Sequence, residues 1–174
     1  MRRHTGHQQW VRAICAFRLN GISRLATCHD ETVWIWDPET GVTRRTLIGH
    51  TNWVNAICAF TLNGTTLLAT ASYDKTVRLW DPGTGANQRT LVGHTSWVNA
   101  ICSLTLNGIT LLATAGNDGT VRIWSPLRDT SLLILPTRNE ALSIACSGAL
   151  LFVGMTTGML AIWLDPEFLS RSLQ

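Results

Sequence analysis

Three sets of side chains in this chain combine the residue types of a hydrolase catalytic triad. Each set contains an imidazole, a hydroxyl, a carboxylate and an indole, in the same order along the sequence. A hydroxyl becomes a nucleophile for acyl transfer when a histidine, itself oriented by a carboxylate, takes its proton. The sets are His7, Thr27, Asp30 and Trp36; His50, Thr70, Asp74 and Trp80; and His94, Thr114, Asp118 and Trp124.

The repetition of these sets argues against catalysis. A triad is defined by its geometry and occurs once per active site, whereas this set recurs at spacings of 43 and 44 residues. Buried imidazole, hydroxyl, carboxylate and indole groups must all be hydrogen bonded, and a fully connected network fixes one arrangement. We therefore predict a structural hydrogen-bond network and no enzyme activity. The first set has one residue fewer between its threonine and its aspartate.

Other site chemistry has little support. The cluster Cys28-His29-Asp30 lacks neighbours that complete four zinc ligands. No phosphate-binding glycine loop precedes a helix, so we expect neither metal nor cofactor. The five cysteines are odd in number and form no CxxC pair, and four of them recur at the same place in successive repeats, namely Cys15, Cys58, Cys102 and Cys146. We therefore expect buried free thiols and a cytoplasmic protein.

Composition excludes further classes of function. Hydrophobic residues make up 45% of the 174 residues and charged residues 14%, which favours a packed core over disorder. The net charge is only +3 and the basic residues are scattered, so nucleic acid is not an expected partner. The sequence contains no stretch of about 18 apolar residues, so no membrane span is predicted.

The elements that must position the repeated sets are short β-strands. Gly-His recurs at Gly6, Gly49 and Gly93, and residues 49–82 match residues 93–126 at 25 of 34 positions. Each repeat contains β-branched and aromatic runs joined by Asn-Gly, the strongest short signal for a tight hairpin. Each unit therefore holds four antiparallel strands and no helix-period segment, which predicts an all-β fold.

The start at Gly-His and the end at Trp-Asp resemble the WD-repeat family. The pairs are Trp36-Asp37 and Trp80-Asp81, and the third repeat departs with Trp124-Ser125. The resemblance implies β-propeller blades over residues 4–46, 47–90, 91–131 and 132–174, in one domain spanning 1–174. The chain most resembles the C-terminal WD-repeat regions of large bacterial signalling proteins.

The fourth repeat is expected to be degenerate. It lacks Gly-His, keeps Trp163, and has Val153 and Thr157 where the other repeats have the hydroxyl and the carboxylate. Without the polar network, this blade is expected to depend on apolar packing, through Leu150, Leu151, Phe152 and Ile162.

The resemblance also implies where partners bind. In WD repeats, the contact positions lie at the start of the first strand and just before the corner aspartate. They map to Trp10, Arg12 and His29; Trp53, Asn55 and Tyr73; Trp97, Asn99 and Asn117; and, more weakly, Ala141, Ser143 and Thr156. Aromatic, amide and arginine side chains are typical of protein-binding hot spots. The alternative is that the three tryptophans simply pack between blades.

We therefore expect a scaffold or sensor module that binds other proteins or peptides. A purely structural or oligomerising segment and a truncated fragment without independent activity are the alternatives. WD propellers usually close with seven blades, so four blades predict an open arc or half ring. The chain is then the C-terminal part of a longer propeller, one half of an eight-bladed homodimer or, least favoured, a closed four-bladed ring.

Overall fold

The computed structural model describes residues 10–165 and 167, and these form fifteen β-strands in four antiparallel sheets. The first sheet contains β1 (Val11–Leu19), β2 (Ile22–His29), β3 (Thr32–Trp36) and β4 (Thr43–Ile48). The second contains β5 (Val54–Leu62), β6 (Thr65–Ser72), β7 (Thr76–Trp80) and β8 (Asn87–Val92). The third contains β9 (Val98–Leu106), β10 (Ile109–Gly116), β11 (Thr120–Trp124) and β12 (Ser131–Pro136). The fourth contains β13 (Ala141–Ser147), β14 (Leu150–Met155) and β15 (Gly158–Trp163).

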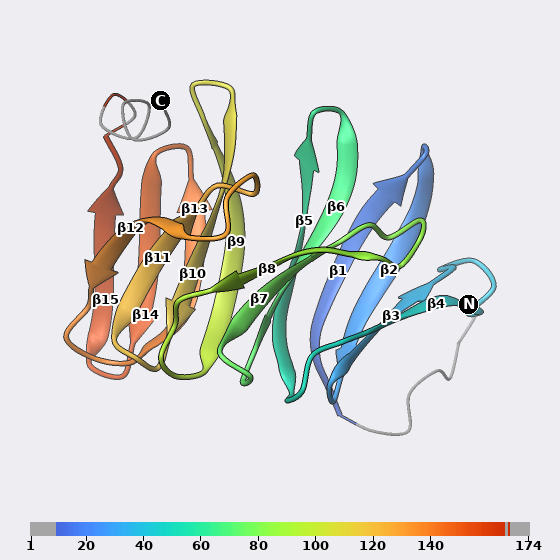
Figure 1. The fold of residues 1–174 in the computed structure, drawn as a ribbon, viewed down its shortest axis with the longest axis horizontal. Coiled ribbons are helices and arrows are strands. Elements are labelled where there is room, and N and C mark those ends of the chain that lie inside the picture. The colour runs from blue at the N-terminus through green and yellow to red at the C-terminus, as the bar shows by residue number, and fades with distance from the viewer. Residues whose placement is uncertain (1–9, 166, 168–174) are drawn as a thin grey trace.

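The four sheets lie side by side as propeller blades in an open arc (Figure 1). This arrangement confirms the all-β fold predicted from the repeats. Two details differ from the expectation. The third sheet extends to Pro136 instead of ending near residue 131, and the described part of the fourth sheet has three strands.

Tight hairpins join the first two strands of each of the first three blades. Asn20, Asn63 and Asn107 all have positive φ angles, near 50°, and the glycine that follows each has φ near 77°. Two consecutive positive φ angles define a type I′ turn, whose twist matches that of the flanking strands. The Asn-Gly prediction is thereby confirmed at all three positions.

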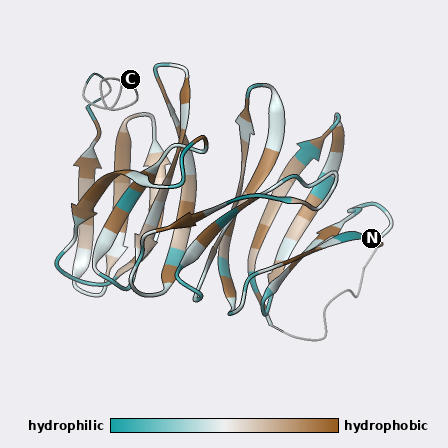
Figure 2. Ribbon diagram, viewed as in Figure 1, coloured by the Kyte–Doolittle hydropathy of each residue, from teal (hydrophilic) through white to brown (hydrophobic). Residues whose placement is uncertain are grey.

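The hydrophobic core lies between adjacent sheets rather than within one. Hydrophobic residues concentrate on the strands (Figure 2), and the buried ones form clusters with those of the next blade. Between the first two blades, Val33, Ile35 and Leu47 pack against Leu68 and Trp80. Each fully buried side chain of this kind stabilises the fold by about 1.5–3 kcal/mol. The blades therefore depend on their neighbours for stability.

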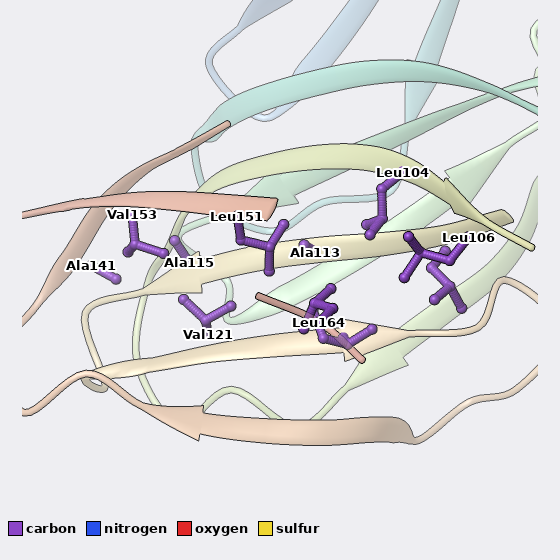
Figure 3. Packing of buried hydrophobic residues seen from close by; sticks show 11 residues of the cluster. Leu104, Leu106, Ala113, Ala115, Val121, Ala141, Leu151, Val153 and Leu164 are labelled. Carbon is purple, nitrogen blue, oxygen red and sulfur yellow. The ribbon is translucent and has the colours of Figure 1, made fainter. Parts of the chain in front are cut away.

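The fourth blade packs on the third through aliphatic side chains. Leu151 and Val153 of β14 lie against Ala113 and Val121 of the third sheet (Figure 3). Val153 pairs with Ile144 as Thr114 pairs with Ile101, so a methyl group replaces the hydroxyl, as the sequence predicts. Our expectation for Leu150 was wrong, because strand alternation turns this side chain to the opposite, solvent-facing side.

The place of Trp163 was also assigned wrongly. Leu112 pairs with Trp124 in the third blade, whereas the matching Leu151 pairs with Ile162. The turn before β15 has two residues instead of the three before β11, which shifts β15 by one position. A shift of one residue moves each side chain to the other face of a strand. Trp163 is consequently 63% exposed.

A similar offset affects the cysteines. Cys15, Cys58 and Cys102 each pair with an alanine of the second strand, but Cys146 pairs with Leu151 and so lies one position later. Cys146 therefore faces back toward the third blade, where its Sγ donates to the carbonyl of Ser103. The expected four-fold recurrence holds for three blades only.

Candidate functional site: a buried network and an exposed aromatic row

The second blade holds a connected polar network at its corner. His50, in the link between β4 and β5, contacts the Asp74 carboxylate through Nδ1 at 2.6 Å and the Thr70 hydroxyl through Nε2 at 2.7 Å. The Trp80 indole donates to the same hydroxyl at 2.8 Å. In the third blade, the three matching contacts are each 2.8 Å. The two internal blades thus repeat one geometry, and the predicted sets come together in both.

The burial of this network leaves it no room for a substrate. The His50 side chain is 1% exposed and Thr70 is fully buried. The Asp74 carboxylate also accepts from the backbone N–H of Thr51 and from Thr76. A nucleophile must reach a substrate, whereas every partner of this hydroxyl lies inside the blade. The network ties the link between blades to the β6–β7 turn and to β7.

The electrostatics hold the pKa of both corner aspartates low and, in the third blade, lower the pKa of the histidine as well. Burial raises the pKa of Asp74, but hydrogen bonds from His50 and Thr76 outweigh it and hold that pKa below its ordinary value. The pKa of Asp118 is lowered in the same way, with Thr120 and Thr95 as donors. Burial lowers the pKa of His94, and this exceeds the opposing effect of Asp118.

Among the described residues of the first blade, the indole-to-hydroxyl contact of the network is present. The Trp36 indole donates to Thr27 at 2.7 Å, and His7 lies outside the described residues. Asp30 does not take the buried place of Asp74. His29 pairs with Thr32, so the turn has two residues, in which Asp30 has a φ of +46° and a side chain that is 56% exposed. The residue missing from the sequence has shortened this turn.

The cysteine, histidine and aspartate of the first blade do not converge on a metal site. Cys28 points into the core between the first two blades, whereas the next residue, His29, lies on the opposite face of β2. Within residues 10–165 and 167, no three His, Cys, Asp or Glu side chains are grouped so that they hold a metal ion.

Three aromatic rings and an arginine form a continuous row at the edge where β1, β5 and β9 begin, the lower edge of Figure 1. Tyr73 stacks on Trp97 with ring centroids 4.3 Å apart and planes inclined by 17°. Trp53 also contacts Tyr73, with ring centroids 6.0 Å apart and planes inclined by 37°. The Arg12 guanidinium lies over the Trp53 ring at 4.2 Å and 5.5 Å from the Tyr73 ring. We call Arg12, Trp53, Tyr73 and Trp97 the aromatic row.

The tryptophans at this edge are not buried between blades. Trp53 is 44% exposed, Trp97 45% and Trp10 83%. Trp53 and Trp97 each contact Tyr73 and stay about half exposed, whereas Tyr73, which contacts both, is partly buried. This geometry favours a contact surface over simple packing between blades.

Amide side chains extend the row on both sides. Arg12 donates to the side-chain oxygen of Asn55 at 3.3 Å. Asn99 donates to Asn117 and to the backbone carbonyl of Ala141, and Asn117 donates to Glu140. Polar contacts therefore continue from the row to the fourth blade. Sequence reasoning missed Glu140, although it directly precedes an expected contact position.

Four of the expected contact residues lie apart from the row, namely His29, Ala141, Ser143 and Thr156. His29 pairs with Val11, as Ser72 pairs with Val54, so it lies one position before the place of Tyr73, and its ring contacts Trp34. The Ala141 side chain is buried. Ser143 and Thr156 are exposed on the fourth blade, beyond the aromatic rings.

Within the described residues, no helix has the length and apolar character that crossing a bilayer requires.

Comparison with known proteins identifies the family. The family model for the WD domain, G-beta repeat, matches residues 1–37, 41–81 and 85–125. Since these matches span more than half of the chain, the protein belongs to the WD40 repeat family. The fourth sheet lies beyond the matched residues, so its assignment as a WD repeat stays a prediction.

The structure is similar to the crystal structure of the computationally designed Ika4 protein, with a TM-score of 0.75. The two chains are 22% identical, and the match covers 94% of this chain and 96% of that one. This likeness supports the propeller-like fold alone. No curated protein sequence matches the chain.

Proposed function

We propose that this chain is a non-catalytic module that binds other proteins or peptides through the aromatic row. WD40 repeats generally mediate interactions between proteins, and the row gives that role a specific surface here. The observation that carries the proposal is the continuous contact between Arg12, Trp53, Tyr73 and Trp97 at a solvent-exposed edge. Tryptophan, tyrosine and arginine are the residues most enriched in binding hot spots.

The row is already ordered before a partner arrives. Tyr73 is held by contacts with two tryptophans, and Arg12 is held by an aromatic face and by Asn55. Side chains fixed in this way lose little conformational entropy on binding, so more of the contact energy contributes to affinity. The buried networks of the internal blades support this edge, because Asp74 and Asp118 directly follow Tyr73 and Asn117.

A display selection with random 12-residue peptides tests this proposal. Peptides selected on the wild-type chain are expected to lose at least about tenfold in affinity when Trp97 is replaced by alanine, as expected for a hot-spot aromatic residue. Val92→Ala on β8 removes a similarly exposed apolar side chain away from the row and is the matched control. Binding that is equal in both variants would contradict the proposal.

A second candidate function, self-association into an eight-bladed ring, is supported by the two ends of the arc. Ile57 and Ile101 are 9% and 8% exposed because the preceding blade covers them. Ile14 has the same place in the first blade, pairing with Thr27 as Ile57 pairs with Thr70, and is 63% exposed. At the other end, Met159 and Trp163 of β15 are exposed. Two copies related by a twofold axis would cover both surfaces.

Light scattering coupled to size exclusion tests the ring. The ring predicts twice the chain mass of 19.2 kDa and a monomer when Ile14 is replaced by glutamate. Ile22→Glu, at a hairpin tip, is the control for an exposed isoleucine outside this surface. A monomeric wild type would refute the ring. Insoluble or aggregating protein would instead favour a segment of a longer propeller, as in the bacterial signalling proteins that the repeats resemble.

A cytoplasmic location remains a prediction from the cysteine pattern.

A further inference from the structure

Among the described residues, the arginine of the aromatic row has no acidic partner. Arg12 makes cation–π contacts with Trp53 and Tyr73 and one hydrogen bond, to Asn55. None of the ion pairs among the described residues includes it. A guanidinium carries five N–H donors in a planar fork that matches a carboxylate. Most of the donor capacity of Arg12 is therefore available to a ligand.

The acidic residue that follows Tyr73 is committed to the interior. Asp74 directly follows Tyr73, but its carboxylate accepts from His50, Thr51 and Thr76. The next residue, Lys75, is exposed and likewise takes part in no ion pair among the described residues. Asp30 is exposed at the same edge, where its backbone carbonyl accepts from the N–H of Val54, but its carboxylate pairs with His29. Among the described residues, the Arg12 guanidinium therefore keeps its charge without a paired carboxylate.

At the opposite end of the row, an apolar ring is followed by polar side chains toward the fourth blade. Trp97 presents an exposed ring surface, and Asn99, Asn117 and Glu140 follow toward the fourth blade. A ligand that complements this order carries a negative charge at the Arg12 end and an apolar or aromatic side chain over Trp97. Electrostatic complementarity of this kind sets orientation and specificity.

We propose that the aromatic row binds an extended peptide segment of a partner protein in which an aspartate or glutamate is followed by an apolar or aromatic residue. The acidic side chain pairs with the Arg12 fork while Arg12 stays on Trp53, and the apolar side chain packs on Trp97. A carboxylate held by a guanidinium makes two parallel charge-assisted hydrogen bonds. This inference rests on the proposed function and specifies its partner.

The same geometry disfavours a basic ligand. A partner lysine or arginine would compete with Arg12 for the face of Trp53 and would meet the charges of Arg12 and Lys75. Like charges brought together at an interface are repulsive. The peptide library must therefore contain cationic sequences, so that their binding would be detected.

The experiment compares peptides selected from the 12-residue library. Selected sequences are expected to be enriched in Asp or Glu beside an apolar residue. A selected peptide is then resynthesised with its acidic residue changed to the amide, and both forms are titrated against wild type, Arg12→Gln and Arg12→Lys. The acidic peptide is expected to lose at least about tenfold in affinity for Arg12→Gln, because hydrogen bonds between charged partners are the strong ones. Arg12→Lys is expected to lose less affinity, since lysine keeps the positive charge but lacks the planar guanidinium.

The amide peptide distinguishes the charge pairing from general stickiness. The amide peptide is expected to bind wild type and Arg12→Gln with equal affinity. That result would show that the acidic residue of the peptide interacts with Arg12. Thermal unfolding of Arg12→Gln checks that the fold is retained. Peptides that require Trp97 but lack acidic residues, or that bind Arg12→Gln as tightly as wild type, would overturn this inference and leave the proposed function standing. Cationic peptides would overturn it in the same way. Failure to select any peptide that depends on Trp97 would count against both.

Discussion

The internal and terminal blades of this arc differ in how they are held. The second and third blades have the full chain from indole to hydroxyl, imidazole and carboxylate. In the first blade, Asp30 lies outside this chain, and in the fourth, Val153 and Ile162 replace the hydroxyl and the indole. The internal blades also supply the three rings of the aromatic row. Polar order in the interior and a stacked binding edge therefore occur in the same part of the molecule.

The interior and the exposed edge of the internal blades therefore have different roles. The networks fix the turns that carry Tyr73 and Asn117, and the stacked side chains at these turns are left for contact with partners. The terminal blades rely on apolar packing against a single neighbour. Substitutions at matching positions of internal and terminal blades can break this comparison or sharpen it.

The largest effect is expected for the corner aspartates. Asp74→Ala leaves the buried His50 without its partner and should lower the free energy of unfolding by about 2–4 kcal/mol. Asp30→Ala removes an exposed carboxylate and should change it by less than about 0.5 kcal/mol. Urea denaturation of both variants measures the difference. Equal losses would mean that the corner aspartate has the same role in both kinds of blade.

A smaller effect is expected at the hydroxyl position. Thr114→Val orphans the Trp124 indole and one nitrogen of His94, which should cost about 1–3 kcal/mol of unfolding free energy. The reverse change, Val153→Thr, puts a hydroxyl into an apolar cluster and should also destabilise, by about 1–3 kcal/mol. Denaturation curves for the two variants show whether each blade suits its own residue. Stabilisation by Val153→Thr would show that the fourth blade keeps a latent network.

The smallest effect is expected from pH. The folded-state pKa of His94 is lowered, so the unfolded chain binds its proton more readily, and stability falls as the pH drops below about 6.5. The lowered pKa values of Asp74 and Asp118 stabilise the fold above about pH 4 and add a further loss below it. Unfolding free energies measured from pH 7.5 to 5 should show the first decline.

His94→Gln provides the control for this pH dependence. The variant should be less stable at every pH, but its stability should fall less steeply below about pH 6.5, because one titrating group is gone. An unchanged slope would assign the acid sensitivity to other groups.

The sequence predicted the features that depend on residue identity within well-matched repeats. Asn20-Gly21 and its two counterparts specify their turns, and the complete sets around Thr70 and Thr114 form the predicted network. The errors trace to single-residue differences in turn length. A two-residue turn exposes Asp30 and moves Trp163 off the network position, although both residues have the expected identity. Strand pairing sets which face a side chain occupies, and turn geometry sets the pairing.

The sequence alone could not predict the stacking within the aromatic row. The predicted contact positions included all four residues, but the contact of Tyr73 with Trp97 joins side chains from adjacent blades. The angle between blades determines that contact, and it follows from core packing rather than from any local motif. Glu140 joins the surface for the same reason, through Asn117 of the preceding blade.

The most direct test of the central claim is a titration of a selected peptide against the double variant Tyr73→Ala, Asn55→Ala. If the edge is a binding surface that the interior supports, affinity should fall by at least about tenfold. Removing the stacked tyrosine should cost the fold only about 1 kcal/mol, so the variant should still unfold cooperatively in urea. Unfolding of the double variant, or full binding by a folded one, would contradict the assignment of these residues to the contact surface.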